Sequence, residues 1–294
     1  MFFKRLRLTL DMIKFEHSVF ALPFALTGAL LAWRQRGFGG TDALEKLFLI
    51  IAAMVTARSA AMAFNRLLDA DIDAANPRTR LRHIPAGLLS KRFAWGFLIS
   101  MSVAFIGASA LLGPLCFALS PVALAIVFAY SFTKRFTSYS HLILGFALGV
   151  APVAAWIAVE GTLDLRMLWM TAAVTCWTAG FDIIYSCQDY DFDRAAGLHS
   201  LPRRFGIAGA LWIARALHLG MLVCLAFLVR SMALGPLAWC GILAVAALLL
   251  YEHSLVSAAD LSRVNAAFFT VNGYVSVLFF CFWAADVWYA HSGM

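Results

Sequence analysis

The chain has 294 residues, of which 63% are hydrophobic and only 13% are charged. This composition excludes an ordinary soluble domain, which needs more charge on its surface, and it favours a protein of the lipid bilayer. The net charge of +7 would suit a nucleic-acid partner. The distribution of the cations indicates membrane topology instead, so we expect no nucleic-acid binding.

Residues 1–16 precede the first long apolar stretch. Phe3, Leu6, Leu10 and Ile13 recur at three- and four-residue spacing. This pattern predicts an amphipathic helix lying on the membrane surface. The alternative is a solvated tail.

Uncharged stretches of about 20 residues, enough to cross a bilayer as a helix, recur along the rest of the chain. The run from Phe93 to Thr133 is too long for one crossing, and Gly113-Pro114 interrupts it, so we divide it into two helices. We therefore predict an all-α integral membrane protein, a single domain over 1–294 built as a nine-helix transmembrane bundle. The predicted spans are 18–35, 47–66, 93–112, 115–133, 139–159, 167–187, 207–229, 233–251 and 264–286.

The lysines and arginines predict the orientation of this bundle. With a cytoplasmic N-terminus, sixteen of the 23 fall on the cytoplasmic side and five outside. The loops after the second, fourth and sixth spans then face the cytoplasm, and we expect the protein in the cytoplasmic (inner) membrane. Arg58 and Arg215 remain inside spans.

Seven of the sixteen acidic residues gather in two short segments, 65–73 and 182–193, which close the second and sixth spans. Both spans are even-numbered and run in the same direction, so both acidic segments emerge at the cytoplasmic face. The alternative is that these are ordinary polar helix ends facing water.

The spacing within the segments predicts shared faces. On a helix, Asn65, Asp69 and Asp73 lie on one face, whereas Asp71 points elsewhere. The second segment has a similar stripe formed by Asp182, Tyr185, Asp189 and Asp193.

Aligned carboxylates repel one another and need a cation. Carboxylate oxygens without histidine or cysteine suit a hard ion such as Mg²⁺. The seven histidines show no ligand spacing, and we assign none of them to a metal.

Three further residues extend this candidate site. Tyr130 and Lys134 lie one helical turn apart after the fourth span. Alone they are what the aromatic belt and the positive-inside rule predict, but beside the acidic segments they form a candidate diphosphate clamp. Arg58 lies two turns deeper than Asn65, where an unpaired guanidinium is costly. We expect it to pair with either a motif carboxylate or the carboxylate of an acceptor substrate.

These residues resemble the UbiA superfamily of membrane aromatic prenyltransferases. Its members carry N-x-x-x-D-x-x-x-D after helix 2, Y-x-x-x-K after helix 4 and D-x-x-x-D after helix 6. This chain matches the three motifs in order with Asn65, Asp69 and Asp73, with Tyr130 and Lys134, and with Asp189 and Asp193. Further matches are the lead-in Asp182-Ile-Ile-Tyr185, the deep arginine Arg58 and the loop 78–87.

The resemblance implies a central cavity that opens near the cytoplasmic face, and transfer of a polyprenyl group from its diphosphate to the ring of an aromatic acid. Two Mg²⁺ ions are expected, one on Asp69 and Asp73 and one on Asp189 and Asp193. Asn65, Arg66 and Lys134 are expected to hold the remaining diphosphate oxygens. Tyr185, Asp182 or Asp191 is expected to orient the acceptor hydroxyl or to take the ring proton, and the choice among them stays open.

Two departures from the family pattern concern the acceptor. Many 4-hydroxybenzoate enzymes have an acid directly after the motif asparagine, where this chain has Arg66, and their first helix begins Arg-x-Asp-Arg-Pro, where this chain has Lys14-Phe-Glu16-His17-Ser18. The residues of this chain at these two positions resemble another branch of the family more closely. Its members are described as 4-hydroxybenzoate polyprenyltransferases, and some of them act on a naphthoate in menaquinone biosynthesis.

We expect 4-hydroxybenzoate as the acceptor, with a dihydroxynaphthoate as the alternative. Haem farnesylation and chlorophyll prenylation are further alternatives within the enzymes. A membrane transporter is the alternative of another class, although transporter sites lie nearer the bilayer midplane than these acids do.

Overall fold

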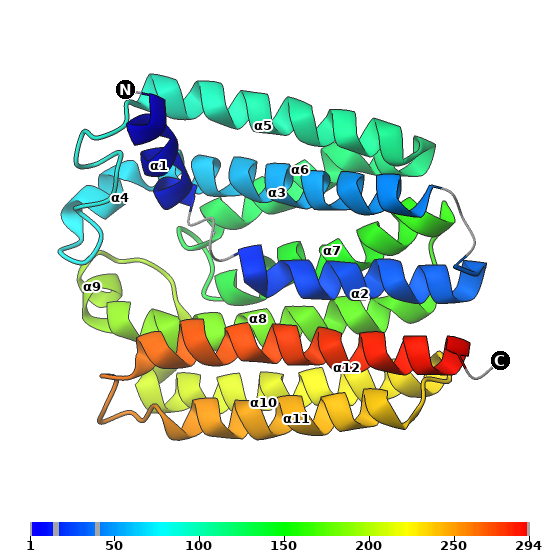
Figure 1. The fold of residues 1–294 in the computed structure, drawn as a ribbon. Coiled ribbons are helices and arrows are strands. Elements are labelled where there is room, and N and C mark those ends of the chain that lie inside the picture. Colours follow the sequence, from blue (N-terminus) through cyan, green and yellow to red (C-terminus); the bar gives the residue numbers. More distant parts are fainter. Residues whose placement is uncertain (1, 14–17, 39–41, 293–294) are drawn as a thin grey trace.

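The structure is a computed structural model that describes residues 2–13, 18–38 and 42–292. All regular elements within these ranges are helices, and they form one elongated bundle (Figure 1). The α-helices are α1 (Phe2–Ile13), α2 (Ser18–Arg36), α3 (Ala43–Leu68), α4 (Ala70–Ala75), α5 (Lys91–Leu112), α6 (Pro114–Thr133), α7 (Ser140–Glu160), α8 (Leu168–Ser186), α9 (Tyr190–Ala195), α10 (Leu201–Ser231), α11 (Pro236–Ser254) and α12 (Asn272–Ser292).

Eight helical segments of the described chain are long and apolar enough to cross a membrane, which confirms the predicted all-α membrane architecture. They comprise α3, α5, α6, α7, α8, α10, α11 and α12, each near a predicted span. The remaining predicted span, 18–35, corresponds to α2, which is not among the eight. The count of nine spans therefore stays a prediction.

Local sequence features account for two of the helix boundaries. Gly113 has φ 140°, a conformation open mainly to glycine, and it separates α5 from α6 as the sequence predicted. The seventh span was predicted to begin at residue 207, but α10 begins at Leu201, where the Ser200 side chain caps it. Gly206, at φ 71°, kinks the helix, and the turn before the kink contains Arg203 and Arg204, so the uncharged stretch begins after them.

The region 1–16, predicted as a surface helix, contains α1 over Phe2–Ile13; residues 1 and 14–16 lie outside the described part of the chain, and the location on the membrane surface stays a prediction. Met12 and Ile13, at the end of α1, are buried. The backbone carbonyl of Met12 accepts a hydrogen bond of 3.3 Å from Nε of Arg66 on α3. The end of α1 is therefore fastened to α3.

The bundle has two differently packed regions. In the packed half, formed by α7 and α8, 56% and 67% of the spanning residues are buried. In the open half, formed by α3, α5 and α6, the shares are 39%, 17% and 17%. Gly145 lets α7 approach α8 closely, since a Cβ there would lie 2.3 Å from the carbonyl oxygen of Thr175. Residues of α8 therefore hold fixed positions relative to α7.

Several of the cations predicted to lie outside cap helix ends. Arg36 Nη1 and Lys46 Nζ donate to the carbonyl oxygen of Val159 at the end of α7, at 2.9 and 3.0 Å. Arg34 Nη1 donates to the carbonyl of Met232 after α10 at 2.9 Å. Cations at helix C-termini complement the helix dipole and satisfy free carbonyls. These exceptions to the charge asymmetry therefore have a structural role.

Candidate active site

The two acidic segments lie at the same end of the bundle (Figure 1). Asp69 sits at the junction of α3 and α4, and Asp189 sits in a short 3-10 turn between α8 and α9. Asn76, directly after α4, donates from Nδ2 to Asp189 Oδ1 at 3.3 Å. One hydrogen bond thus joins the two acidic segments, which are more than a hundred residues apart in the chain.

The first acidic segment has the predicted shared face. Asn65 Nδ2 donates to Asp69 Oδ2 at 3.0 Å, and the side chain of Asp73 is buried. The side chain of Asp71, in contrast, is 95% exposed and is paired with Lys91 at 3.4 Å. This confirms that Asp71 points away from the stripe formed by Asn65, Asp69 and Asp73.

The second acidic segment is more deeply buried. Asp189 and Asp193 are 6% and 1% exposed, whereas Asp191 is exposed to solvent. The Tyr185 hydroxyl accepts a hydrogen bond from Arg78 Nη1 at 3.3 Å, and its ring packs on Phe268 with centroids 4.3 Å apart. Within this stripe, Tyr185 therefore lies against an aromatic side chain.

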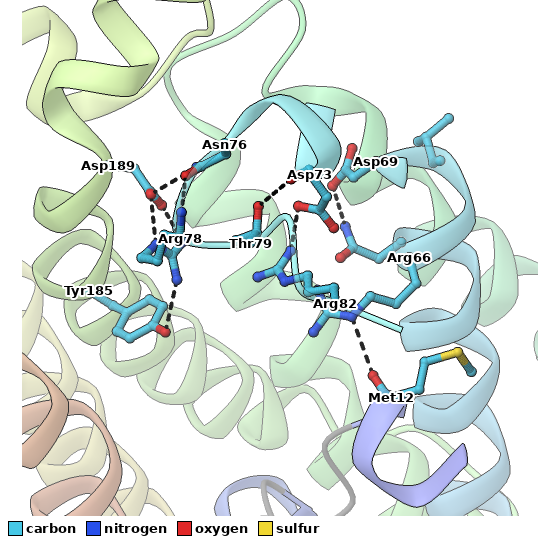
Figure 2. Close-up of polar contacts among 12 residues, drawn as sticks. Met12, Arg66, Asp69, Asp73, Asn76, Arg78, Thr79, Arg82, Tyr185 and Asp189 are labelled. Carbon is cyan, nitrogen blue, oxygen red and sulfur yellow. Dashed lines mark hydrogen bonds and ion pairs between the residues drawn. The ribbon is translucent and has the colours of Figure 1, made fainter. Parts of the chain in front are cut away.

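Two arginines of the loop between α4 and α5 each hold one motif carboxylate (Figure 2). Arg78 contacts Asp189 with two nitrogens, Nε at 2.9 Å and Nη2 at 2.6 Å. Arg82 Nη1 donates to Asp73 Oδ1 at 2.7 Å. Neither arginine was predicted to belong to the site. The only signal was the likeness of the loop 78–87 to the family's, and their partners lie up to 111 residues away.

One carboxylate oxygen in each acidic segment lacks a partner. Oδ2 of Asp73 and Oδ2 of Asp193 are buried, and neither has a hydrogen-bond partner among the described residues. A buried, unpaired carboxylate oxygen is costly, and a cation would satisfy it. The two segments therefore fit a divalent metal each on chemical grounds.

The site is not a finished protein cage for a metal. In the ranges that the structure describes, no three histidine, cysteine or acidic side chains converge on one point. Mg²⁺ commonly binds through one or two carboxylates and completes its shell with substrate phosphates and water. Two pairs of aspartates agree with that mode of binding.

The carboxyl group of Asp69 in the first segment is partly neutralised by Arg135, whose Nη2 lies 3.4 Å from Asp69 Oδ1. Burial, together with the neighbouring Asp73 carboxylate, raises the pKa of Asp69 above its ordinary value, although Lys134 and Arg135 act in the opposite direction. Lys134 interacts electrostatically with Asp69, Asp189 and Asp193. It therefore serves both acidic segments, as a clamp for an anion between them would.

An apolar cavity of about 300 Å³ lies below the acidic segments, between the open half and α7. Tyr130 and Arg58 belong to its wall, and along α6 its lining extends from Tyr130 to Cys116. That separation is roughly 20 Å at about 1.5 Å per residue. The cavity is long and its lining is mostly aliphatic, such as Leu144, Leu148 and Val127.

Arg58 lacks the predicted pairing with a motif carboxylate among the described residues, and its pairing with an acceptor carboxylate stays a prediction. Its Nε is buried and lacks a hydrogen-bond partner, and no ion pair of Arg58 occurs among the described residues. Arg66 is also buried, and its Nε binds the carbonyl of Met12, while the rest of its guanidinium lies close to Arg82 (Figure 2). Arg215, which the sequence left inside a span, stacks on the ring of Trp212 at 4.6 Å.

Asp182 pairs with a histidine that sequence reasoning did not single out. His141 Nδ1 lies 2.6 Å from Asp182 Oδ2. The side chain of His141 is completely buried, and that of Asp182 is 23% exposed. No motif spacing links the two residues, because they meet only through the packing of α7 on α8.

The protein combines many membrane-spanning helices, two acidic motifs and an apolar cavity. These features are those of membrane enzymes that act on phosphates with a lipid tail. The sequence profile of the UbiA prenyltransferase family matches residues 21–290. The chain therefore belongs to the UbiA prenyltransferase family, as the motifs suggested. It is accordingly an enzyme that transfers prenyl groups, and the transporter alternative loses its support.

Relatives and solved structures agree with this assignment. The 4-hydroxybenzoate octaprenyltransferase of Shewanella halifaxensis is 28% identical over 243 residues, covering 82% of this chain and 84% of that protein. The enzyme of the same name from Vibrio atlanticus is 29% identical over 249 residues, covering 83% and 87%.

The apo structure of a UbiA homolog from Aeropyrum pernix K1 is 35% identical, covers 92% of this chain and 98% of its own, and superposes with a TM-score of 0.82. A UbiA homolog from Archaeoglobus fulgidus bound to GPP and Mg²⁺ is 22% identical, covers 95% and 99%, and has a TM-score of 0.70. This second likeness shows the shared fold alone.

Proposed function

We propose that this protein transfers a polyprenyl group from polyprenyl diphosphate to the ring of 4-hydroxybenzoate, in quinone biosynthesis at the cytoplasmic face of the inner membrane. The observation that carries the proposal is that each acidic segment has one buried carboxylate oxygen without a partner among the described residues, and that an apolar cavity reaches Tyr130, which interacts electrostatically with Asp69. A polyprenyl diphosphate matches this arrangement, since its charged diphosphate lies at one end and its apolar chain at the other. The curated relatives named as 4-hydroxybenzoate octaprenyltransferases support this choice of acceptor.

Two Mg²⁺ ions fit the aspartates, one held by Asp69 and Asp73 and the other by Asp189 and Asp193. When bound, Mg²⁺ neutralises negative charge on the diphosphate as it becomes the leaving group. The solved structure of a homolog with GPP and Mg²⁺ supports divalent metal use in this fold.

The arginines of the α4–α5 loop have a second role in this proposal. In the structure, Arg78 and Arg82 neutralise Asp189 and Asp73. If Asp189 and Asp73 held metal ions, both guanidinium groups would be available to donate to diphosphate oxygens, which they match well in geometry. Asn65, Arg66 and Lys134 complete the polar lining of the head-group site.

The cavity wall performs the remaining tasks. Its aliphatic side chains bind the prenyl tail and exclude water from the allylic cation that forms when the carbon–oxygen bond to diphosphate breaks. A ring carbon of the acceptor then attacks that cation. Arg58 lies in the cavity wall, its Nε is buried without a hydrogen-bond partner among the described residues, and it is placed to bind the acceptor carboxylate.

The runner-up acceptor is a dihydroxynaphthoate in menaquinone biosynthesis. Arg66 in place of the acid that follows the motif asparagine in many 4-hydroxybenzoate enzymes favours this alternative. Both acceptors carry a carboxylate and a hydroxylated ring, so the residues assigned above serve either one.

Purified protein in detergent, supplied with a labelled polyprenyl diphosphate, Mg²⁺ and each acceptor separately, tests the proposal. We expect a prenylated aromatic product and released diphosphate with one of the two acids, and neither product when a chelator replaces Mg²⁺. The Asp189→Ala protein is the matched control for background hydrolysis. Release of diphosphate without a prenylated acid of either kind would contradict the proposed function.

A further inference from the structure

The contact between His141 and Asp182 is a hydrogen-bonded pair near the site to which the proposed binding of metal and diphosphate assigns no role. His141 Nδ1 and Asp182 Oδ2 are 2.6 Å apart. The opposite ring nitrogen, Nε2, is buried and has no hydrogen-bond partner among the described residues. Within the part of the chain that the structure describes, the hydrogen bonding of this imidazole is therefore directed at Asp182 alone.

The position of His141 on α7 relates it to the cavity. His141, Leu144, Leu148 and Ala151 follow a three-four-three spacing and so lie on one face of the helix. The last three of these residues line the apolar cavity. His141 therefore occupies the next position on that face, one turn beyond the cavity in the direction of the acidic segments.

The position of Asp182 on α8 also places it between the apolar cavity and the acidic segments. Asp182 precedes Tyr185 by three residues and Asp189 by seven, so the three side chains share a stripe. His141 also interacts electrostatically with Asp193. The pair thus lies at the boundary between the apolar cavity and the head-group site, where the acceptor ring must meet the first carbon of the prenyl chain.

The environment of Asp182 suits a proton acceptor. The side chain of His141 is completely buried, whereas that of Asp182 is 23% exposed, so the carboxylate keeps an accessible part while His141 occupies Oδ2. Of the two other candidates, Asp191 is exposed to solvent, and the Tyr185 hydroxyl accepts a hydrogen bond from Arg78. A hydroxyl next to a guanidinium is a poor base for carbon-bound protons.

We propose that His141 is a positioning residue that donates its Nδ1–H to Asp182 and aims the free carboxylate oxygen at the proton lost from the acceptor ring. The proposal rests on the proposed function, because it assigns the residue that completes that reaction. After the ring carbon has bonded to the prenyl cation, its carbon–hydrogen bond breaks. The electron pair restores the aromatic ring, and the proton forms an O–H bond at Oδ1 of Asp182. The proton then passes to water, and the carboxylate is restored.

The test compares acceptors with hydrogen or deuterium on the ring carbons beside the hydroxyl group, in single turnovers. In the wild type we expect no primary isotope effect on product formation, since a well-placed base removes the proton faster than the cation forms. In His141→Leu the rate should fall by about 10- to 100-fold, the usual cost of losing a supporting residue, and a normal primary isotope effect should appear. The Michaelis constants of both substrates should change little.

Two further variants keep the proposal falsifiable even where His141→Leu fails to fold. The amide of His141→Asn replaces the donor near the position of Nδ1, so it should restore the rate and remove the isotope effect. Asp182→Asn should show the isotope effect at least as strongly as His141→Leu. Thermal melting in detergent identifies the variants that fold.

The outcomes are distinct. A wild type that prenylates neither acid defeats the proposed function itself. An active wild type whose folded His141 variants show no isotope effect, or only a raised Michaelis constant, overturns the role of His141. An isotope effect in Asp191→Asn but not in Asp182→Asn would assign the base to Asp191 and also overturn it.

Discussion

The packed half and the open half of the bundle each supply one acidic motif, but they hold it differently. Asp189 and Asp193 follow α8, whose spanning segment is 67% buried and contains the fully buried Trp177. Asp69 and Asp73 follow α3, which packs beside the weakly buried α5 and borders the cavity. The second motif therefore follows a helix that is well buried within the protein, while the first follows a helix whose side chains line the cavity.

The largest effect is expected from removing one carboxylate on either side. Asp189→Ala in the packed half and Asp69→Ala in the open half should each lower turnover by about 10²–10³-fold, because each removes charge stabilisation that is strongest when diphosphate leaves. Steady-state rates at saturating Mg²⁺ measure this. If either variant kept a rate near that of the wild type, the site would not need both halves.

Arg58→Lys probes the cavity wall of the open half. A lysine replaces a bidentate guanidinium by a point charge, and the loss of one charged hydrogen bond corresponds to about tenfold in affinity. We expect the Michaelis constant of the acceptor to rise by that factor, with little change for the prenyl diphosphate. The reverse result, an unchanged acceptor constant beside a raised diphosphate constant, would remove Arg58 from the acceptor pocket.

A pair of glycine substitutions tests the packing difference directly. Gly145→Ala places a Cβ 2.3 Å from the carbonyl of Thr175, and overpacking of this kind costs about 1–3 kcal/mol. Gly107→Ala on α5 meets nothing within 4 Å and should be neutral or stabilising, by up to about 1 kcal/mol. Melting temperatures in detergent compare the two. Equal destabilisation would show that the open half is packed as tightly as the other.

The smallest effect is expected at Asp71. Its side chain is 95% exposed and only pairs with Lys91, so Asp71→Asn should leave turnover within about twofold, as surface ion pairs contribute little. Asp73→Asn, two residues away and buried against Arg82, should be far more damaging. Turnover of the two variants under identical conditions is the measurement, and similar losses would refute the helical-face assignment.

The spans and the two acidic motifs were predictable because they are local patterns. Apolar stretches fix the helices, and four-residue spacing fixes which carboxylates share a face, as Asp71 and Asp73 illustrate. The boundary of α10 was missed because its first turn contains Arg203 and Arg204, and a search for uncharged spans leaves such a turn out.

The contacts between motifs could not be predicted in the same way. Arg78 meets Asp189, and His141 meets Asp182, only after α8 has packed against α7 and the α4–α5 loop has folded over the site. Nothing in the spacing of these residues records that packing. The deep position of Arg58 was readable from the helix, but the fact that its side chain lines a cavity was not.

The ion pairs of Arg78 with Asp189 and of Arg82 with Asp73 affect the order in which metal and substrate bind. A free Mg²⁺ ion must compete with a guanidinium for Asp189 and for Asp73, and it offers that guanidinium no new partner. A Mg²⁺–diphosphate complex would provide a new partner for each group: the cation for the carboxylates and the diphosphate for the arginines. We therefore expect metal and prenyl diphosphate to bind together, and the protein stripped of metal by a chelator to remain folded, with its own side chains serving as counter-ions.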